Sequence, residues 1–231
     1  MKKWLVSSLS AACLLALPSI ACADSWTSLI FAYGDNRLFS DELDWAYGAY
    51  KGECGMDVPV LAGVSAMARD LGSNPGGPGD LWSGGNDAVL CASFSNTFVN
   101  LYDTETLDIY DENLNQGSDN RLDTSTGEWA YGYWKGECAA NEAVIGVSQW
   151  PNDATRSIHC AVVTNMTAPA SCLPYNFDGH DGRQVPFRNQ DWAPNWWKGE
   201  CSPGNYVKGV AMSTGEHRQA AVILCCTPPS L

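Results

Sequence analysis

The chain has 231 residues, of which 26 are acidic and 13 are basic, so its formal net charge is −13. This charge argues against electrostatic binding of nucleic acid or of an anionic membrane, because both need a basic patch. Hydrophobic residues make up 45% of the chain and charged residues 17%, which excludes a disordered polar tail. The length is sufficient for one large domain or two small ones with a packed core.

The first 23 residues have the pattern of a secretory signal peptide. Two lysines are followed by an apolar run from Leu5 to Leu17 and by an A-x-A motif that ends at Ala23. The apolar run is too short to span a membrane. We therefore expect cleavage after Ala23 and a secreted or periplasmic protein without membrane insertion. A lipoprotein anchored at Cys22 is disfavoured, because Ser19 stands where such a signal needs a branched apolar residue.

Cleavage at this position changes the two unusual counts in the composition. Eight of the ten cysteines and nine of the ten tryptophans remain, together with 11 basic and 26 acidic residues. An even number of cysteines in an exported chain predicts a disulfide framework.

An eleven-residue motif then occurs three times without a gap. Its pattern is [DE]-W-A-x4-K-G-E-C, and the three copies occupy residues 44–54, 128–138 and 191–201. An Asp-x-Arg triplet precedes each copy, and each copy is followed by Gly-Val and then by a short apolar run that ends in cysteine. The pattern predicts three homologous repeats, at residues 24–100, 101–168 and 169–231.

The repeat also predicts how the cysteines pair. Each repeat has one cysteine at the end of the motif and one at the end of the apolar run, and two cysteines remain. The predicted disulfides are Cys54–Cys91, Cys138–Cys160, Cys201–Cys225 and Cys172–Cys226. Because Cys225 and Cys226 are adjacent, the sequence leaves an exchange of partners between them open.

The secondary structure is expected to be β. No long run has a helical period, and seven short β-branched runs are bounded by turn residues, at 27–33, 58–65, 88–94, 143–148, 157–164, 206–212 and 220–225. In each repeat, the Gly-Val run that follows the motif and the apolar run that ends in cysteine should form a hairpin. Segments 67–86 and 101–116, the second of them acidic, are expected to be a surface loop and a loop or irregular linker.

These elements predict an all-β fold of three disulfide-stapled repeats in a pseudo-threefold arrangement. A β-trefoil-like fold is the first expectation and a β-prism-like fold the second. A trefoil needs about four strands per repeat, whereas only two or three are visible, and the Gln-x-Trp repeat of ricin-type trefoil lectins is missing.

Repeated aromatic and charged residues are the candidate ligand-binding set. A sugar ring can lie with its C–H face on an aromatic ring, while charged side chains hydrogen-bond its hydroxyls. Aromatic residues that vary between the motif copies are the better candidates. The full set comprises Asp35, Arg37, Trp45, Tyr50, Asp119, Arg121, Trp129, Trp134, Asp181, Arg183, Trp192, Trp196 and Trp197.

The same residues also have a structural interpretation. A repeated tryptophan commonly fills the core of its repeat. The Lys-Gly-Glu triplet is compatible with a turn whose glycine has positive φ. The Asp-x-Arg triplet is compatible with an internal ion pair. The sequence favours this structural role for the motif tryptophans and the charged pairs, and leaves the ligand-binding role open.

Signatures of metal and enzyme chemistry are scarce. Segment 111–122 begins like a calcium loop, but Gly117 and Leu122 stand at the wrong positions for one. We expect no cofactor and no metal, with calcium in the acidic segment as the weaker alternative. No nucleophile elbow, zinc-protease motif or phosphate loop occurs. His159 is expected to be half buried in a strand, and His180 to lie in a loop.

The sequence therefore favours a secreted, lectin-like protein that binds carbohydrate or a glycoconjugate, and it favours a binding protein over an enzyme. Two alternatives stay open. One is an exported, glycosidase-like hydrolase that uses an acidic pair. The other is an interaction module of the cell envelope, such as a toxin component or an inhibitor. The sequence determines neither the ligand nor the oligomeric state.

Overall fold

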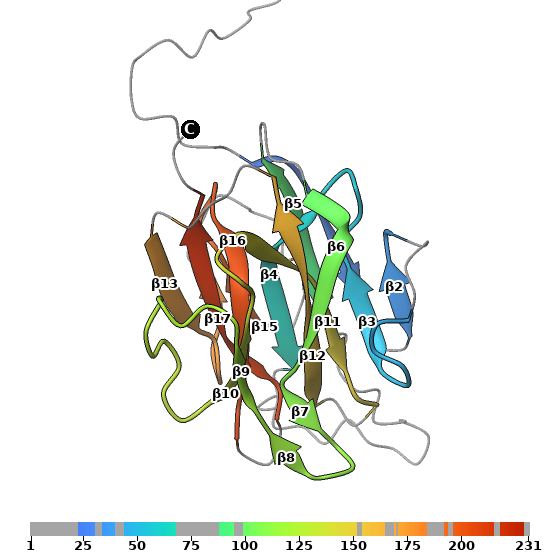
Figure 1. The fold of residues 1–231 in the computed structure, drawn as a ribbon, viewed down its shortest axis with the longest axis vertical. Helices are drawn as coiled ribbons and strands as arrows, with labels where there is room; N and C mark the ends of the chain where they lie inside the picture. Colours follow the sequence, from blue (N-terminus) through green and yellow to red (C-terminus); the bar gives the residue numbers. More distant parts are fainter. Residues whose placement is uncertain are drawn as a thin grey trace, which may run out of the picture.

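The computed structural model describes residues 23–30, 34–39, 44–67, 88–94, 99–151, 154–164, 169, 171–183, 192–193, 196–214 and 218–228. In these residues the protein is all-β, with 17 strands (Figure 1). No helix that is long and apolar enough to cross a membrane is found in the part of the chain described. The predicted signal segment before Ala23 and nearly all of the predicted loop at 67–86 lie outside these residues.

Fifteen of the strands form three five-stranded sheets, which we number 1 to 3. Sheet 1 contains, in spatial order, β1 (Ala23–Ile30), β5 (Ala88–Phe94), β4 (Val60–Met67), β15 (Trp196–Glu200) and β14 (Gly182–Arg183). Sheet 2 contains β6 (Val99–Asp108), β12 (Thr155–Val163), β11 (Glu142–Gln149), β3 (Tyr50–Glu53) and β2 (Asp35–Arg37). Sheet 3 contains β13 (Ser171–Asn176), β17 (Ala220–Thr227), β16 (Tyr206–Met212), β10 (Trp134–Glu137) and β9 (Asp119–Arg121).

The three predicted hairpins form the centre of the sheets. β4 pairs with β5, β11 with β12 and β16 with β17, all antiparallel. Their sequences are apolar on both faces because both faces are covered, which explains the missing alternation of apolar and polar residues. The seven predicted strands are thus confirmed, with small differences at their ends.

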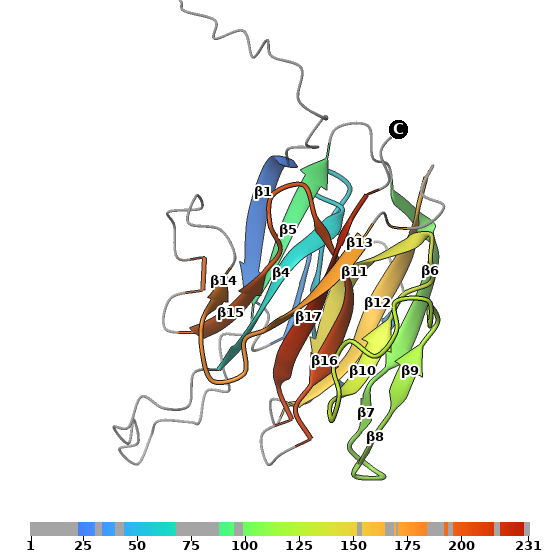
Figure 2. The same ribbon diagram turned by 90° about the vertical axis from the view of Figure 1, so that its left-hand side faces the viewer.

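Each sheet is completed by strands from a different motif copy. The Lys-Gly-Glu strand of the first copy, β3, pairs with β11, that of the second, β10, with β16, and that of the third, β15, with β4. The Asp-x-Arg strands β2, β9 and β14 pair in parallel with β3, β10 and β15, respectively. The first copy therefore completes sheet 2, the second sheet 3, and the third sheet 1. Figure 2 shows sheet 1 on the left and β6 of sheet 2 on the right.

Two sequence expectations are wrong at this level. Lys-Gly-Glu is a strand and not a turn, and its glycine is not among those with positive φ. A Cβ on Gly199 would lie 2.6 Å from the ring of Phe177, so this glycine permits close packing between the strand and its neighbours. The acidic segment is also ordered: β6 is the edge strand of sheet 2, and β7 (Tyr110–Asp111) and β8 (Gln116–Gly117) form a short ribbon.

Three disulfides join the sheets to one another. The central strands β4, β11 and β16 are in mutual contact and enclose an apolar core, which contains six cysteines that are at most 2% exposed. Each motif cysteine follows a strand of one sheet and bonds to the hairpin of another. The pairs are Cys54–Cys91 between sheets 2 and 1, Cys138–Cys160 between sheets 3 and 2, and Cys201–Cys225 between sheets 1 and 3.

The fourth disulfide, Cys172–Cys226, joins the neighbouring strands β13 and β17 within sheet 3. All four predicted pairs are therefore confirmed, including the choice between Cys225 and Cys226.

Candidate functional site

The motif tryptophans cover the sheets on the side away from the central core. Trp129 and Trp192 are 7% and 6% exposed, and Trp45 is half-buried. Each ring faces the glycine of the Gly-Val strand beneath it, where an added Cβ would lie 3.0–3.1 Å from the indole. These pairs are Gly146 with Trp45, Gly209 with Trp129 and Gly63 with Trp192. The motif tryptophans therefore serve packing, as their structural interpretation predicts.

A buried glutamate lies beneath two of these rings. The Trp129 indole N–H donates to Glu137 Oε2 at 2.8 Å, and that of Trp192 donates to Glu200 Oε2 at 3.0 Å. Burial raises the pKa of Glu137, although the hydrogen bonds from Thr126 and Trp129 oppose this effect. The glutamate of the motif is thus part of the scaffold.

The motif lysine is also buried and holds the turn of its own motif copy. Lys51 is 1% exposed. Its Nζ lies 2.8 Å from Asp44 Oδ1 and 2.9 Å from Asp35 Oδ1, and it donates to the carbonyls of Ala49 (2.8 Å) and Ala46 (3.2 Å). One ammonium group therefore connects the Asp-x-Arg strand β2 to the turn at residues 45–48. We call this turn, and the equivalent turns that contain Trp129 and Trp192, the tryptophan turns.

The second motif copy repeats this arrangement. Lys135 Nζ lies 3.1 Å from Glu128 Oε1 and 3.2 Å from Asp119 Oδ2, and it donates to the Tyr133 carbonyl. The Arg121 guanidinium pairs with Asp119 at 3.0 Å and donates to the Gly127 carbonyl.

In the third copy, Lys198 Nζ donates to the carbonyls of Ala193 and Trp196 and lies 3.9 Å from Asp181. The acidic residue that begins this copy, Asp191, lies outside the described residues, and so does the side chain of Arg183.

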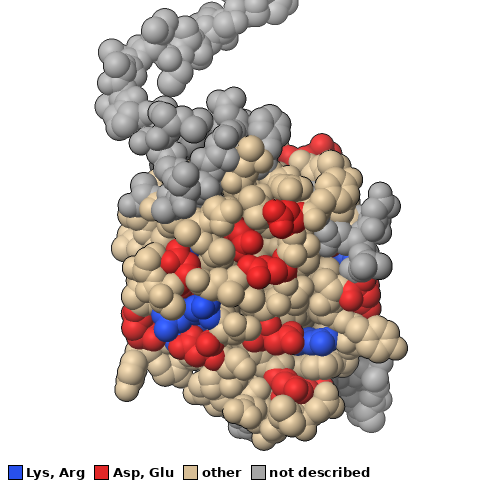
Figure 3. All heavy atoms as spheres, in the orientation of Figure 1, with Lys and Arg blue, Asp and Glu red and all other residues tan. Residues whose placement is uncertain are grey.

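The carboxylates around the buried lysines remain accessible. The side chains of Asp35, Asp44, Asp119 and Glu128 are 41–44% exposed. The hydrogen bond from Lys51 holds the pKa of Asp44 below its usual value. Figure 3 shows that the few basic groups on one face of the molecule lie next to acidic ones. Each of the first two motif copies therefore presents two accessible carboxylates in positions set by a buried lysine.

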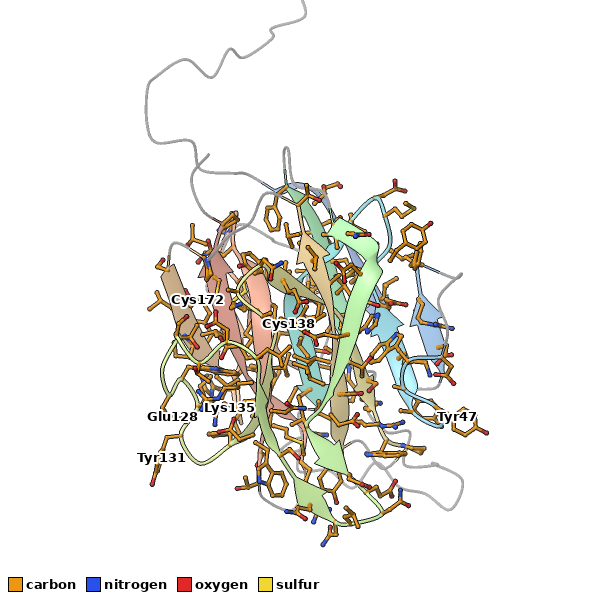
Figure 4. The ribbon with its side chains drawn as sticks, viewed as in Figure 1. Tyr47, Glu128, Tyr131, Lys135, Cys138 and Cys172 are labelled. Atoms are coloured by element: carbon orange, nitrogen blue, oxygen red, sulfur yellow. A yellow bond between two sulfur atoms is a disulfide. The ribbon has the colours of Figure 1, made fainter. Side chains whose placement is uncertain are left out.

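An exposed tyrosine accompanies each carboxylate pair and is not among the ligand-binding residues predicted from the sequence. Tyr47 and Tyr131 occupy the same motif position and are 84% and 90% exposed. Each precedes a glycine with positive φ, Gly48 or Gly132, that closes the turn. Figure 4 shows both tyrosines projecting from the body of the molecule. Their shared place in W-A-Y-G was the signal available; the third copy has Pro194 there, outside the described residues.

The variable aromatic residues lie elsewhere. Tyr50 and Trp197 are half-buried and pack against the central core. Trp134 also packs there and stacks on Tyr110 with 5.9 Å between ring centroids, while Gly117 lies against its indole. Trp196 packs in the second apolar cluster, among the residues outside the central core. The structure thus shows these rings mainly as packing elements.

One residue distinguishes the first tryptophan turn from the others. His159, on β12, is 2% exposed, so the expectation of half burial is wrong. Its ring stacks on Trp45 with 4.7 Å between centroids and 7° between planes. Its Nδ1 lies 3.1 Å from Thr106 Oγ1 and its Nε2 3.6 Å from Glu53 Oε1. His180, by contrast, is exposed in a turn.

A further buried charge lies under the second motif copy. Lys208 is fully buried, donates to the Cys138 carbonyl at 2.9 Å and lies 3.4 Å from Asp123. Burial lowers the pKa of Lys208, and the charges of Asp123 and Glu137 oppose this. Burial also raises the pKa of Tyr206, whose hydroxyl has no hydrogen-bond partner among the described residues.

Metal-ligand geometry is found at one place in the described residues, where Cys138, Glu142 and Cys160 lie close together. Both cysteines belong to a disulfide, so neither offers a thiolate. No such group is found among the described side chains of the acidic segment at 101–116.

Comparison with protein-family models, with curated proteins and with solved structures finds no match. The functional argument therefore rests on the geometry of this chain.

Proposed function

We propose that the protein binds carbohydrate, and that the first two motif turns are its sugar sites. Site A consists of Tyr47 with Asp35 and Asp44, and site B of Tyr131 with Asp119 and Glu128. The observation that carries the proposal is the buried lysine, which holds two accessible carboxylates at two equivalent positions. One carboxylate of each pair lies at the start of the turn that carries the exposed tyrosine, and the other belongs to the neighbouring Asp-x-Arg strand.

This geometry suits a sugar for two physical reasons. A tyrosine ring offers a flat surface to the C–H face of a pyranose, and fixed carboxylates accept short, charge-assisted hydrogen bonds from adjacent hydroxyls. Because the lysine fixes the carboxylates before the ligand arrives, binding loses less side-chain entropy. Two sites on one molecule also favour multivalent glycans.

The scaffold supports the same proposal. We infer a pseudo-threefold, prism-like arrangement of homologous repeats, because the three sheets have the same strand order and are joined in a cycle by equivalent disulfides. The four disulfides are consistent with an extracellular or periplasmic protein. A signal peptide that is cleaved after Ala23 remains part of this proposal.

The predicted ligand set changes accordingly. Asp35 and Asp119 stay in it as direct contacts, and Arg37 and Arg121 as the groups that position them. Tyr47 and Tyr131 replace the motif tryptophans and the half-buried aromatic residues as platforms.

A printed glycan array tests the proposal. We expect Tyr47→Ala and Tyr131→Ala each to weaken binding about tenfold, because each removes one aromatic platform, and the double variant to lose it. The matched control is Tyr102→Ala, since Tyr102 is 84% exposed but belongs to β6, outside the three motif copies. Binding of no glycan, or equal binding by the double variant, would contradict the proposal.

The hydrolase alternative gains no support from the neighbouring carboxyl groups of Glu105 and Glu142. Glu105 and Glu142 are hydrogen-bonded to each other. The two carboxyl groups of a glycosidase lie about 5–10 Å apart, so that the sugar and water fit between them. A protein partner in the cell envelope remains the alternative if the array shows no binding.

A further inference from the structure

Strand β12 holds the turn of site A by two contacts. His159 stacks on Trp45, and the Arg156 guanidinium donates to the carbonyl of Tyr47. Trp45 and Tyr47 are two residues apart on the same turn. The position of the exposed tyrosine is therefore set in part by a histidine.

The other two tryptophan turns have no such histidine. The positions that correspond to His159 in the closing cysteine runs are Leu90 and Leu224. The indoles of Trp129 and Trp192 donate to buried glutamates, whereas the Trp45 indole N–H has no hydrogen-bond partner within the described residues. Trp45 is thus held differently, by stacking on His159 and not by a hydrogen bond to a buried glutamate in the described residues.

We propose that His159 makes site A pH-dependent: protonation of its imidazole strengthens ligand binding at Tyr47 and leaves site B unchanged. This inference rests on the proposed function, because it describes the regulation of a site named there.

The groups around His159 explain the direction of the effect. Glu53 on β3 faces its Nε2 and Thr106 on β6 its Nδ1, while β11 presents Gly146 as its register partner. Two further charges lie on β6: Glu105, the register partner of Cys160, is hydrogen-bonded with Glu142, and Asp108, the register partner of Ser157, pairs with Arg156. Glu53 is therefore a charged group that faces the imidazole directly.

A neutral imidazole has one N–H donor and a protonated one has two. In the neutral form, Nε2–H can already face Glu53 while Nδ1 accepts a hydrogen bond from the Thr106 hydroxyl. Protonation adds a positive charge, which makes the contact with the Glu53 carboxylate an ion pair and places a cation on the face of Trp45, which is itself attractive. Both effects fix Trp45 more firmly against β12. A turn that is fixed in advance presents Tyr47 to a ligand at a lower entropic cost. Histidine is the side chain whose charge ordinarily changes between pH 5 and 8.

The first test needs no ligand. In ¹⁵N NMR spectra of the full protein, we expect the Trp45 indole N–H resonance to move between pH 7.5 and pH 5.5, and those of Trp129 and Trp192 to stay in place. His159→Leu should abolish the movement. Leucine is the suitable replacement because Leu90 and Leu224 occupy the equivalent positions in the other two sheets. An unchanged Trp45 resonance, or one that still moves in the variant, overturns the proposal.

The second test uses the printed glycan array at the same two pH values. The Tyr131→Ala variant retains only site A, and we expect it to bind roughly three- to tenfold more tightly at pH 5.5. The Tyr47→Ala variant retains only site B and should bind equally at both. His159→Leu, added to Tyr131→Ala, should remove the pH difference.

The outcomes separate the two claims. If neither single-site variant binds any glycan, the proposed function fails, and the NMR result alone decides whether His159 controls the turn. If both variants bind with the same pH dependence, the sugar sites stand and the role of His159 is overturned.

Discussion

At the scale of single residues, the unusual feature of this structure is that its lysines are buried. All four lysines that follow residue 23 are at most 3% exposed: Lys51, Lys135, Lys198 and Lys208. A buried ammonium is tolerated only when its donors are satisfied. Here backbone carbonyls and carboxylates satisfy them, so each motif lysine acts as a cross-link between two segments of chain.

Replacing Lys51 by Met should therefore destabilise the protein by about 2–4 kcal/mol, because Asp35, Asp44 and two carbonyls lose their shared partner. Urea unfolding followed by tryptophan fluorescence measures the change. Leu114→Ala, at a side chain that is 70% exposed, is the control and should change stability by less than about 0.5 kcal/mol. A Lys51→Met protein as stable as the native one would show that the lysine is dispensable.

The pair Glu105–Glu142 should make stability depend on pH. Burial, a hydrogen bond with Glu142 and the charge of Asp103 raise the pKa of Glu105 to about 7. Since the folded protein favours the protonated carboxyl, its contribution to stability is fully present below the unfolded value of 4.5 and is lost as the pH rises through about 7.

Glu105→Gln should accordingly be more stable than the native protein at pH 8 and lose this advantage at pH 4, measured as thermal midpoints. Asp103→Asn removes only the smallest of the four contributions, which also include the charge of Glu142, and should have a weaker effect of the same sign. An identical pH profile in the native protein and in Glu105→Gln would refute the assignment.

At the scale of the element, the Gly-Val strand and the tryptophan turn pack closely because the strand has a glycine at the point of contact. A Cβ on Gly209 would lie 3.0 Å from the Trp129 ring and 2.8 Å from the Gly136 carbonyl. Neither neighbour can move easily, because one is a buried indole and the other is strand backbone.

Gly209→Ala should therefore cost about 1–3 kcal/mol through overpacking, even though alanine is otherwise a better strand residue than glycine. Denaturant titration against Thr124→Ala, an exposed loop position, measures the difference. An alanine variant with native stability would mean that sheet 3 can shift to accept the methyl group.

The sequence predicted the elements whose signals are local. The hairpins that contain Gly63, Gly146 and Gly209 were visible because β-branched runs and turn residues mark them in the chain itself. Short strands such as β2, β9 and β14 were not predicted, because two or three polar residues carry no periodic pattern. They are strands only because a Lys-Gly-Glu strand lies beside each of them.

At the scale of the whole molecule, exchange of strands makes the three sheets interdependent. β3, β10 and β15 each leave their own segment and complete another sheet, and a disulfide crosses between sheets at the end of each. No sheet is complete without two segments of the chain. Contacts of such long sequence separation are formed together or not at all.

We therefore expect one unfolding transition for the oxidised protein. Tryptophan fluorescence and far-ultraviolet circular dichroism should give coincident urea curves, since the tryptophans lie on the same interdependent sheets. Two separated transitions, or curves with different midpoints, would indicate that one sheet unfolds by itself.

The sequence by itself determined the motif, the all-β class and the disulfide pairs apart from the choice between Cys225 and Cys226, because repetition, cysteine spacing and β-branched runs are properties of the linear chain. Only the tertiary structure decided which sheet each Lys-Gly-Glu strand joins, and which aromatic residues reach the surface. The aromatic residue before the motif lysine was a predicted platform, but Tyr50, Trp134 and Trp197 are half-buried and pack against the central core. Tyr47 and Tyr131 became candidates because their turns close around a buried lysine, and burial is a property of the packed molecule.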